Sequence, residues 1–369
     1  MRERGDGFHG RRDGPERGIE GRSKSGVGVK TEQLQAVGVR GVVGIARAVA
    51  LLKAGGTVAF PTETVYGLGA NALDPAAVAK IFVAKERPGW DPLIVHVDGR
   101  EMLERVAVVP TGLQGRQVGQ LIDAFWPGPL TLLLPRTADV PDTVTAGRPL
   151  VGVRMPANPI ARQLIREAGL PVAAPSANRF GGPSPTTAAH VLADLDGRID
   201  AVLDGGPANL GVESTVLDLE AMAIYRPGAV TAAMISSMLG VEVRVVAAKV
   251  EAEAAGGPEA LPSPGMGMRH YAPRARLVLV EGQSEMLEEI GKLSGAEVGV
   301  MLPDDWDRGT AGAVFRWGPW GDAETLARLL YFGLRLLDER GVKVIVCPVP
   351  EMDGLGEALR DRLEKAARK

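Results

Sequence analysis

The stretch from Gly55 to His96, GGTVAFPTETVYGLGANALDPAAVAKIFVAKERPGWDPLIVH, decides how this chain is expected to fold. Its first part, Gly56–Pro61, is an apolar run that stops at a proline, which is typical of a buried strand ending in a loop. The hydroxyls of Thr62 and Thr64 follow at once, ahead of the glycines in Gly67–Gly69. Strand exits are frequent ligand positions in α/β folds, so the sequence predicts a binding site here.

The second part of the stretch predicts a helix and another strand. A helix is expected from Asp74 to Ala84, with Asp74 as its N-cap and Pro75 at its first position. The strand Leu93–Val97 places His96 among apolar neighbours. A histidine in such a strand is more often a hydrogen-bonded structural residue than a ligand, and both interpretations stay open.

Lys85 and Arg87 lie between these two elements. Residues two apart in an extended segment point the same way, so this pair is expected to aim two cations at one point. A triphosphate or a carboxylate suits such a pair. The alternative is a solvated basic surface, which is the more common fate of a Lys-x-Arg sequence.

Polar side chains recur at later strand ends. Arg154 interrupts the apolar strand 151–155, and a buried guanidinium needs an anionic partner, either an internal carboxylate or a ligand. Further hydroxyl, amide and cationic candidates follow strands or turns along the chain: Ser176, Asn178, Ser184, Ser214 and Arg226. An α/β fold brings such distant segments together at one edge of its sheet.

Length and composition indicate two domains. The chain has 369 residues, and single cores seldom exceed about 300 residues. We expect a disordered tail over 1–29, a catalytic domain over 30–246 with a twisted mixed sheet and covering helices, a linker over 247–274, and a smaller α/β domain over 275–369. Alternating strands and helices in the last segment favour a parallel sheet of Rossmann or flavodoxin type.

Several classes of protein are disfavoured. A net charge of −3 argues against a protein that holds nucleic acid mainly by phosphate neutralisation. The single cysteine, Cys347, excludes intrachain disulfides and cysteine-based metal sites, and we expect no metal site made by the protein. No apolar stretch is long enough to span a membrane and no secretory signal is visible, so a cytoplasmic location and no membrane partner are expected.

The motifs together are more specific than any one of them. The strings PTETVYGLGANA (61–72), Lys85-x-Arg87-Pro88, PLIVH (92–96) and WPGPLT (126–131) resemble the YrdC-type threonylcarbamoyl-AMP synthases. A Pro-Gly-Met string at 264–266, followed by His-Tyr-Ala-Pro at 270–273, resembles the linker that joins a second domain in long members of this family. The resemblance covers residues 38 to 369, and in the family this linker is a movable lid over the active site.

The resemblance implies the reaction of L-threonine, bicarbonate and ATP to L-threonylcarbamoyl-AMP and pyrophosphate, with Mg²⁺ accompanying ATP. The product would serve the transferase that modifies adenosine 37 of transfer RNA; stable binding of transfer RNA by this chain is not expected. Lys85 and Arg87 are the implied catalytic residues. Threonine would be held by Thr62, Thr64, His96, Arg154 and Ser214; ATP would be held by Lys85, Arg87, Asp91, Ser176, Asn178, Ser184, Arg226 and Tyr271, with His270 a further candidate. The family often has Asn where this chain has Asp91, so the role of Asp91 stays open.

Two other functions remain as alternatives. YrdC-type domains also occur in carbamoyl-transferring maturation factors of hydrogenases, but the zinc fingers of those proteins need more cysteines than this chain has. A concave basic surface could instead bind double-stranded RNA by shape. Pyrophosphate release that depends on threonine separates the enzyme from the RNA-binding module.

Overall fold

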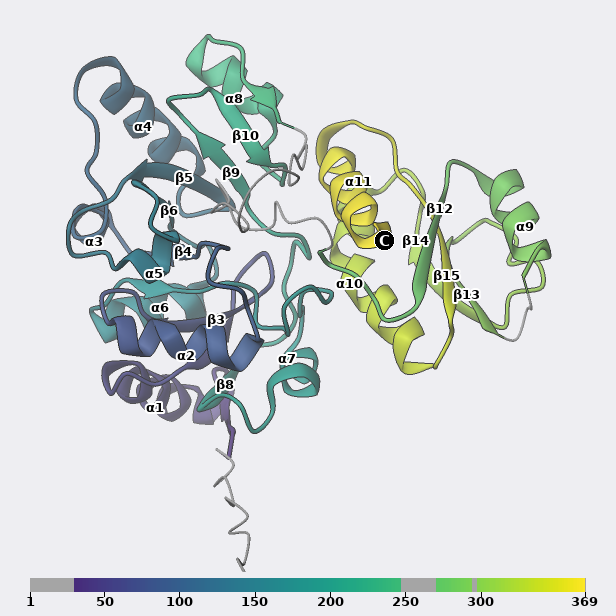
Figure 1. Ribbon diagram of the computed structural model, residues 1–369, viewed down its shortest axis with the longest axis horizontal. Coiled ribbons are helices and arrows are strands. Elements are labelled where there is room, and N and C mark those ends of the chain that lie inside the picture. Colours follow the sequence, from purple (N-terminus) through teal and green to yellow (C-terminus); the bar gives the residue numbers. More distant parts are fainter. Residues whose placement is uncertain (1–29, 247–269, 294–296, 369) are drawn as a thin grey trace, which may run out of the picture.

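The computed structural model describes residues 30–246, 270–293 and 297–368. Two α/β domains lie side by side, and the expected class is confirmed for both (Figure 1). The larger domain is built on an 11-stranded mixed sheet in the order β1-β8-β2-β3-β7-β4-β6-β5-β9-β10-β11. The smaller domain has a four-stranded sheet in the order β12-β15-β13-β14.

The larger domain alternates strands and helices, and the predicted elements around the site are present. Its strands are β1 (Glu32–Gln35), β2 (Val58–Pro61), β3 (Tyr66–Asn71), β4 (Ile94–His96), β5 (Leu130–Pro135), β6 (Leu150–Arg154), β7 (Val172–Ala173), β8 (Ala201–Asp204), β9 (Thr215–Asp218), β10 (Ala223–Arg226) and β11 (Arg244–Val245). Its helices are the 3₁₀ turn η1 (Gly38–Arg40), α1 (Gly41–Lys53), α2 (Pro75–Lys85), α3 (Arg100–Glu104), α4 (Gly112–Phe125), α5 (Asp142–Thr145), α6 (Pro159–Ala168), α7 (Ala188–Leu195) and α8 (Ala232–Leu239).

Strand β3 was not predicted. The glycines that suggested a loop lie inside this strand, which pairs antiparallel with β2 and with β7. A Cβ on Gly69 would meet the side chains of Phe60 and Val172 at 2.6 and 2.8 Å, so glycine is needed where three strands pack closely. Thr62 and Thr64 therefore lie in the tight turn between two strands.

The end of α2 corrects the expectation for Lys85 and Arg87. Asp74 caps the helix as predicted, accepting hydrogen bonds from the backbone N–H groups of Ala76 and Ala77. The helix runs on to Lys85, and Glu86 then turns left-handed with φ 55°. Lys85 and Arg87 are thus not in an extended segment, and the argument from residues two apart was wrong.

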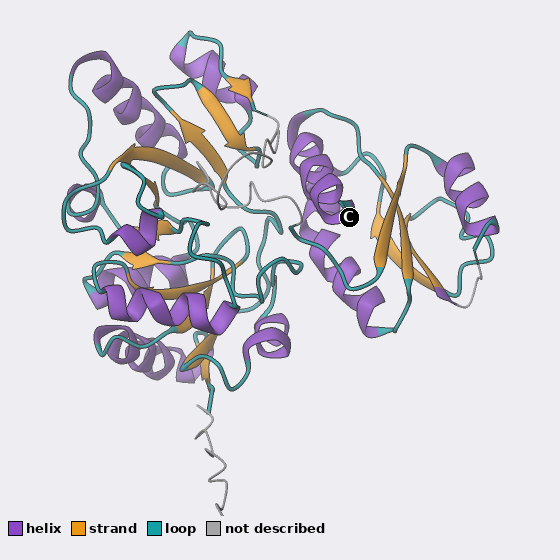
Figure 2. Ribbon diagram, viewed as in Figure 1, coloured by secondary structure: helices purple, strands orange, loops and turns teal. Residues whose placement is uncertain are grey.

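The smaller domain is all parallel, as predicted. Its elements are β12 (Arg276–Val280), α9 (Gln283–Gly291), β13 (Val298–Pro303), β14 (Ala313–Gly318), α10 (Ala323–Glu339), β15 (Val344–Pro348) and α11 (Gly354–Ala367). Helices α10 and α11 cover the side toward the larger domain, and α9 covers the other side (Figure 2). Strand β14 was missed by the sequence analysis. Cys347 is buried in β15, and burial raises the pKa of its thiol.

The two domains meet at several places on the larger domain, including the segment 211–214, Val65 and Asp194. A Cβ on Gly211 would lie 2.3 Å from the carbonyl oxygen of Ala327 in α10, so only glycine allows this approach. Val212 and Val65 of the larger domain pack into the hydrophobic core of the smaller one. Among the described residues, no helix combines the length and apolarity that crossing a membrane requires.

Candidate functional site

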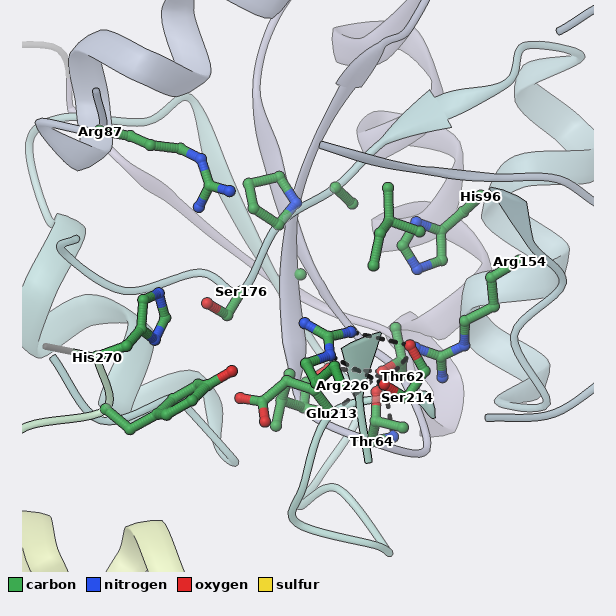
Figure 3. Close-up of a pocket in the computed structure, with 16 residues that line it drawn as sticks. Thr62, Thr64, Arg87, His96, Arg154, Ser176, Glu213, Ser214, Arg226 and His270 are labelled. Carbon is green, nitrogen blue, oxygen red and sulfur yellow. Dashed lines mark hydrogen bonds between the residues drawn. The ribbon is translucent and has the colours of Figure 1, made fainter. Parts of the chain in front are cut away.

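The candidate site is a cavity of about 50 Å³ in the larger domain, at the face that meets the smaller one. Figure 3 shows its walls. Its lining comes from the β2–β3 turn and the start of β3, the residues after α2, the strands β4 and β6, the segments after β7 and before β9, the end of β10, and the segment before β12. The lining residues are Thr62, Thr64, Val65, Gly67, Arg87, Ile94, His96, Arg154, Ala174, Pro175, Ser176, Glu213, Ser214, Arg226, His270 and Tyr271.

Most of the predicted site residues meet at this cavity. It is lined by the candidates Thr62, Thr64, Arg87, His96, Arg154, Ser176, Ser214, Arg226, His270 and Tyr271. Four further candidates lie outside its lining: Lys85, Asp91, Asn178 and Ser184.

Arg154 is held by an internal network at one end of the cavity. Its guanidinium forms an ion pair with Glu63 at 2.6 Å and donates to the hydroxyl of Thr64 at 3.0 Å and to the carbonyl of Gly128 at 3.1 Å. Thr62 and Thr64 share a hydrogen bond of 2.8 Å. An internal carboxylate was one of the two partners predicted for Arg154. The sequence did not indicate that Glu63 is this carboxylate. Arg154 also lines the cavity, so a ligand can reach it.

His96 lies beside Arg154 with a neutral ring. Burial, and then the positive charge of Arg154, lower the pKa of His96 to about 3. Its Nδ1 has no hydrogen-bond partner among the described residues, and its ring packs edge-on against Phe60. A neutral imidazole with an unused nitrogen can donate to or accept from a ligand hydroxyl or amine.

Ser214 and Arg226 form the floor between the two ends of the cavity. Arg226 donates from Nε to the carbonyl of Ser214 at 3.0 Å and from Nη2 to its hydroxyl at 3.1 Å. The hydroxyl of Ser214 also shares a hydrogen bond of 2.8 Å with Thr131. Arg226 makes no ion pair within the part of the chain that the structure describes, so its charge is available to an anionic ligand.

Arg87 lies at the other end and is paired with Asp91. The ion pair measures 3.0 Å with both side chains almost fully buried, and Arg87 also donates to the carbonyls of Asp91 and Pro92. Asp91 holds Arg87 in place and does not line the cavity. The structure thus gives Asp91 a contact that positions Arg87, and the contact of Asp91 with ATP stays a prediction.

Lys85 has a different position from the one predicted. Its fully buried ammonium donates to the backbone carbonyls of Ser176 and Asn178, at 2.6 and 2.5 Å. Burial, with Arg87 as the next cause, lowers the pKa of Lys85 well below its ordinary value. Lys85 therefore anchors the segment that carries Ser176 into the cavity and is not itself exposed to it.

Asn178 and Ser184 are also directed into the protein. The Asn178 amide donates to the carbonyls of Arg179 and Gly182, which closes the turn after β7. The hydroxyl of Ser184 donates to Glu213 at 2.5 Å. Neither residue lines the cavity, and their contacts with ATP stay predictions.

Glu213 is a lining residue that the sequence analysis missed. Its carboxylate accepts hydrogen bonds from two side chains of the smaller domain, Tyr331 at 3.0 Å and Arg362 at 2.8 Å. The charge of Arg362 and then that of Arg226 oppose the effect of burial, and the pKa of Glu213 is lowered. Its position just before Ser214 was visible in the sequence, but nothing there indicated a contact with a domain more than a hundred residues away.

His270 and Tyr271 cover the cavity from the linker side. Both are buried, and Tyr271 stacks against the guanidinium of Arg362 at 5.3 Å. His270 Nδ1 and the Tyr271 hydroxyl have no hydrogen-bond partner in the described residues. The rest of the predicted lid, 247–269, lies outside the described residues, as does the predicted tail 1–29.

Comparisons with known proteins agree with this arrangement. Residues 50–228 match the Sua5/YciO/YrdC family model described as Telomere recombination, and 230–368 match the model described as Threonylcarbamoyl-AMP synthase, C-terminal domain. The chain is 43% identical to the threonylcarbamoyl-AMP synthase of Pyrococcus abyssi over 87% of this chain and 93% of that protein. It is 44% identical to the threonylcarbamoyl-AMP synthase of Bacillus subtilis, over 88% of this chain and 92% of that protein.

A solved structure matches both domains. The crystal structure of Pyrococcus abyssi Sua5 complexed with L-threonine superposes with a TM-score of 0.82 at 41% identity, covering 91% of this chain and 97% of that one. A match over 91% of this chain takes in both domains. The chain therefore belongs to the threonylcarbamoyl-AMP synthase family, in its long form with a C-terminal domain.

Proposed function

We propose that this chain makes L-threonylcarbamoyl-AMP and pyrophosphate from L-threonine, bicarbonate and ATP. The observation that carries the proposal is the division of one cavity into two ends. Arg154, His96 and the threonines lie at one end, and Arg87, Ser176 and His270 lie at the other, with Arg226 between them (Figure 3). The first end suits an amino acid and the second suits a nucleotide with its phosphates.

The amino-acid end offers groups that match threonine. Arg154 carries a fixed positive charge for the carboxylate, and Thr62 and Thr64 offer hydroxyls near it. His96 supplies a neutral nitrogen for the amine or the hydroxyl. The related Pyrococcus abyssi protein has been crystallised with L-threonine, which supports the same assignment here.

The reaction needs positioning and charge neutralisation more than covalent help from the protein. The threonine amine and bicarbonate combine to an N-carboxylated amino acid with loss of water. A carboxylate oxygen of this species attacks the α-phosphorus of ATP, the bond from that phosphorus to the bridging oxygen breaks, and pyrophosphate leaves with the electron pair. Arg87 and Arg226 neutralise the charge that the leaving group gains.

Mg²⁺ is expected to enter with ATP as part of that substrate. In the described residues no cluster of three or more His, Cys, Asp or Glu side chains is placed to hold a metal ion. Three carboxylates at or beside the cavity, Glu213, Asp91 and Glu63, are already paired with Arg362, Arg87 and Arg154. We expect the phosphate oxygens of ATP to supply ligands for the ion.

ATP can enter only if the cover moves. The cavity of about 50 Å³ is far smaller than the several hundred Å³ usual for a small-molecule site. His270 and Tyr271 fill its open side, and their displacement creates the missing volume. The product would be passed to the transferase that modifies transfer RNA.

Pyrophosphate release tests the proposal. Purified protein with Mg²⁺-ATP is assayed with threonine and bicarbonate together and with each omitted. Release that requires both supports the synthase function. Folded protein that releases no pyrophosphate but binds double-stranded RNA with strong salt dependence would favour the RNA-binding alternative.

A further inference from the structure

The last helix of the smaller domain carries two buried cations against the cover of the cavity. Arg362 and Lys365 are three residues apart on α11 and so share one face of it. Arg362 contacts Glu213 and the ring of Tyr271, which both line the cavity. The carbonyl of Lys365 accepts the backbone N–H of His270 at 3.4 Å, so α11 lies directly against the cover.

The charges around His270 do not balance. Five basic side chains are buried there, Lys85, Arg87, Arg226, Arg362 and Lys365. After burial itself, the charges of Arg87, Lys85, Lys365 and Arg226 contribute to lowering the pKa of His270 below its ordinary value. Three carboxylates accompany them in ion pairs: Asp91 with Arg87, Glu213 with Arg362, and Asp361 with Lys365. The pKa of Lys85 is lowered well below its ordinary value, so Lys85 is left out of the count. The four other cations face three carboxylates, which leaves an excess of one positive charge. Excess buried charge of this kind calls for an anionic ligand.

Unused hydrogen-bonding atoms mark the same place. In the described residues, Arg362 Nη2, the Tyr271 hydroxyl and His270 Nδ1 are buried and have no partner. Buried polar atoms without partners are rare, and several together indicate that a ligand or water completes them. Burial also lowers the pKa of Lys365 to about 8, against the opposing effect of Asp361. A nearby polyanion would favour its charged form.

We propose that Lys365 is a phosphate-binding residue of the active site, supplied by the smaller domain. When His270 moves aside, the terminal phosphates of ATP, and the pyrophosphate formed from them, take the volume of its imidazole and contact Lys365, with Arg362 behind it. The inference rests on the proposed function and extends it: the smaller domain binds the leaving group directly.

The test measures binding without turnover. Inorganic pyrophosphate with Mg²⁺, AMP and L-threonine are titrated separately into the full chain and into Lys365→Met, which keeps most of the side-chain volume. We expect the Kd for pyrophosphate to rise about tenfold, corresponding to about 1.4 kcal/mol, while those for AMP and threonine stay within about twofold. Lys365→Arg is expected to restore the affinity. Lys343→Ala removes an exposed lysine of the same domain and serves as the matched control.

Two outcomes would overturn the inference. One is an unchanged pyrophosphate affinity in Lys365→Met, and the other is an equal weakening of all three ligands, which a structural role would produce. If Lys365→Met does not fold, Asp361→Asn is used, since it removes the carboxylate that competes for Lys365. Tighter pyrophosphate binding in this variant supports the inference, and unchanged or weaker binding contradicts it. Wild-type turnover is measured in parallel, so failure of the synthase function is seen separately.

Discussion

Glu213 and Arg362 join the two domains through a buried ion pair of 2.8 Å at the wall of the cavity. Both side chains are almost fully excluded from solvent, and Glu213 immediately precedes Ser214, which lines the site. The smaller domain therefore holds a segment of the active site in place. This contact suggests why the two domains act as one enzyme.

Removing one partner of this pair is expected to be costly. Glu213→Gln leaves Arg362 with Asp361 as its remaining carboxylate partner, and we expect a loss of about 1–3 kcal/mol in the free energy of unfolding. Chemical denaturation measures it. The exposed pair between Arg360 and Glu281 provides the control, because Glu281→Gln is expected to change stability by less than about 1 kcal/mol. Similar small losses in both variants would contradict the account.

Arg154 is expected to bind the carboxylate of threonine while it keeps its ion pair with Glu63. Glu63→Gln keeps the guanidinium in the cavity and should leave the affinity for threonine within about threefold of that of the unchanged protein. Arg154→Met should weaken this affinity by about a hundredfold, because it removes a bidentate charged contact. Calorimetric titration with threonine compares the two variants. Equal losses in both would mean that Arg154 acts only through its internal ion pair.

Lys85 is expected to act by positioning, because its ammonium faces the carbonyls of Ser176 and Asn178. Lys85→Met should weaken AMP binding and raise the amide hydrogen exchange of residues 176–182, while threonine binding is preserved. Mass spectrometry of exchanged peptides reads out the second effect. Weak AMP binding with unchanged exchange would show that Lys85 contacts the phosphates directly.

Acid is expected to destabilise the protein below about pH 6.5 through its buried histidines. The pKa is about 3 for His96 and about 4 for His190, and that of His270 lies well below its ordinary value, with burial as the first cause in each case. Since all three titrate normally when unfolded, the unfolded state binds more protons in this range, and stability falls as pH falls. Each contributes up to about 1.4 kcal/mol per pH unit.

Denaturation at a series of pH values checks this expectation. His96→Gln should reduce the slope of unfolding free energy against pH between about 6.5 and 4.5, since one depressed group is removed. A slope that does not change in this variant would show that His96 is protonated in the folded protein.

Much of the fold was predictable because its local signals are strong. The cap at Asp74 sufficed to predict α2, and the alternation of strands and helices in the last segment sufficed to predict a parallel sheet. Strand β3 was not predicted because its glycines are not typical of a strand. The packing of Phe60 against Gly69 explains the glycine at that position.

The site could be predicted as a set of residues but not as a geometry. The hydroxyls and arginines were found from their positions at strand ends, and most of them line the cavity. The inward direction of Lys85 follows from its place as the last residue of α2, on the buried face of that helix. The left-handed Glu86 ends the helix there, and the sequence gives no turn signal for it. The partners Glu63 and Arg362 depend on contacts between distant segments, which sequence patterns do not encode.

The most direct test of the central claim is mass spectrometry of the product. Protein, Mg²⁺-ATP and L-threonine are incubated with ¹³C-bicarbonate or with ordinary bicarbonate, and the nucleotides are analysed. The account predicts threonylcarbamoyl-AMP whose mass rises by one carbon isotope with the labelled bicarbonate, and no such species when threonine is omitted. Folded protein that yields neither this adduct nor pyrophosphate would contradict it.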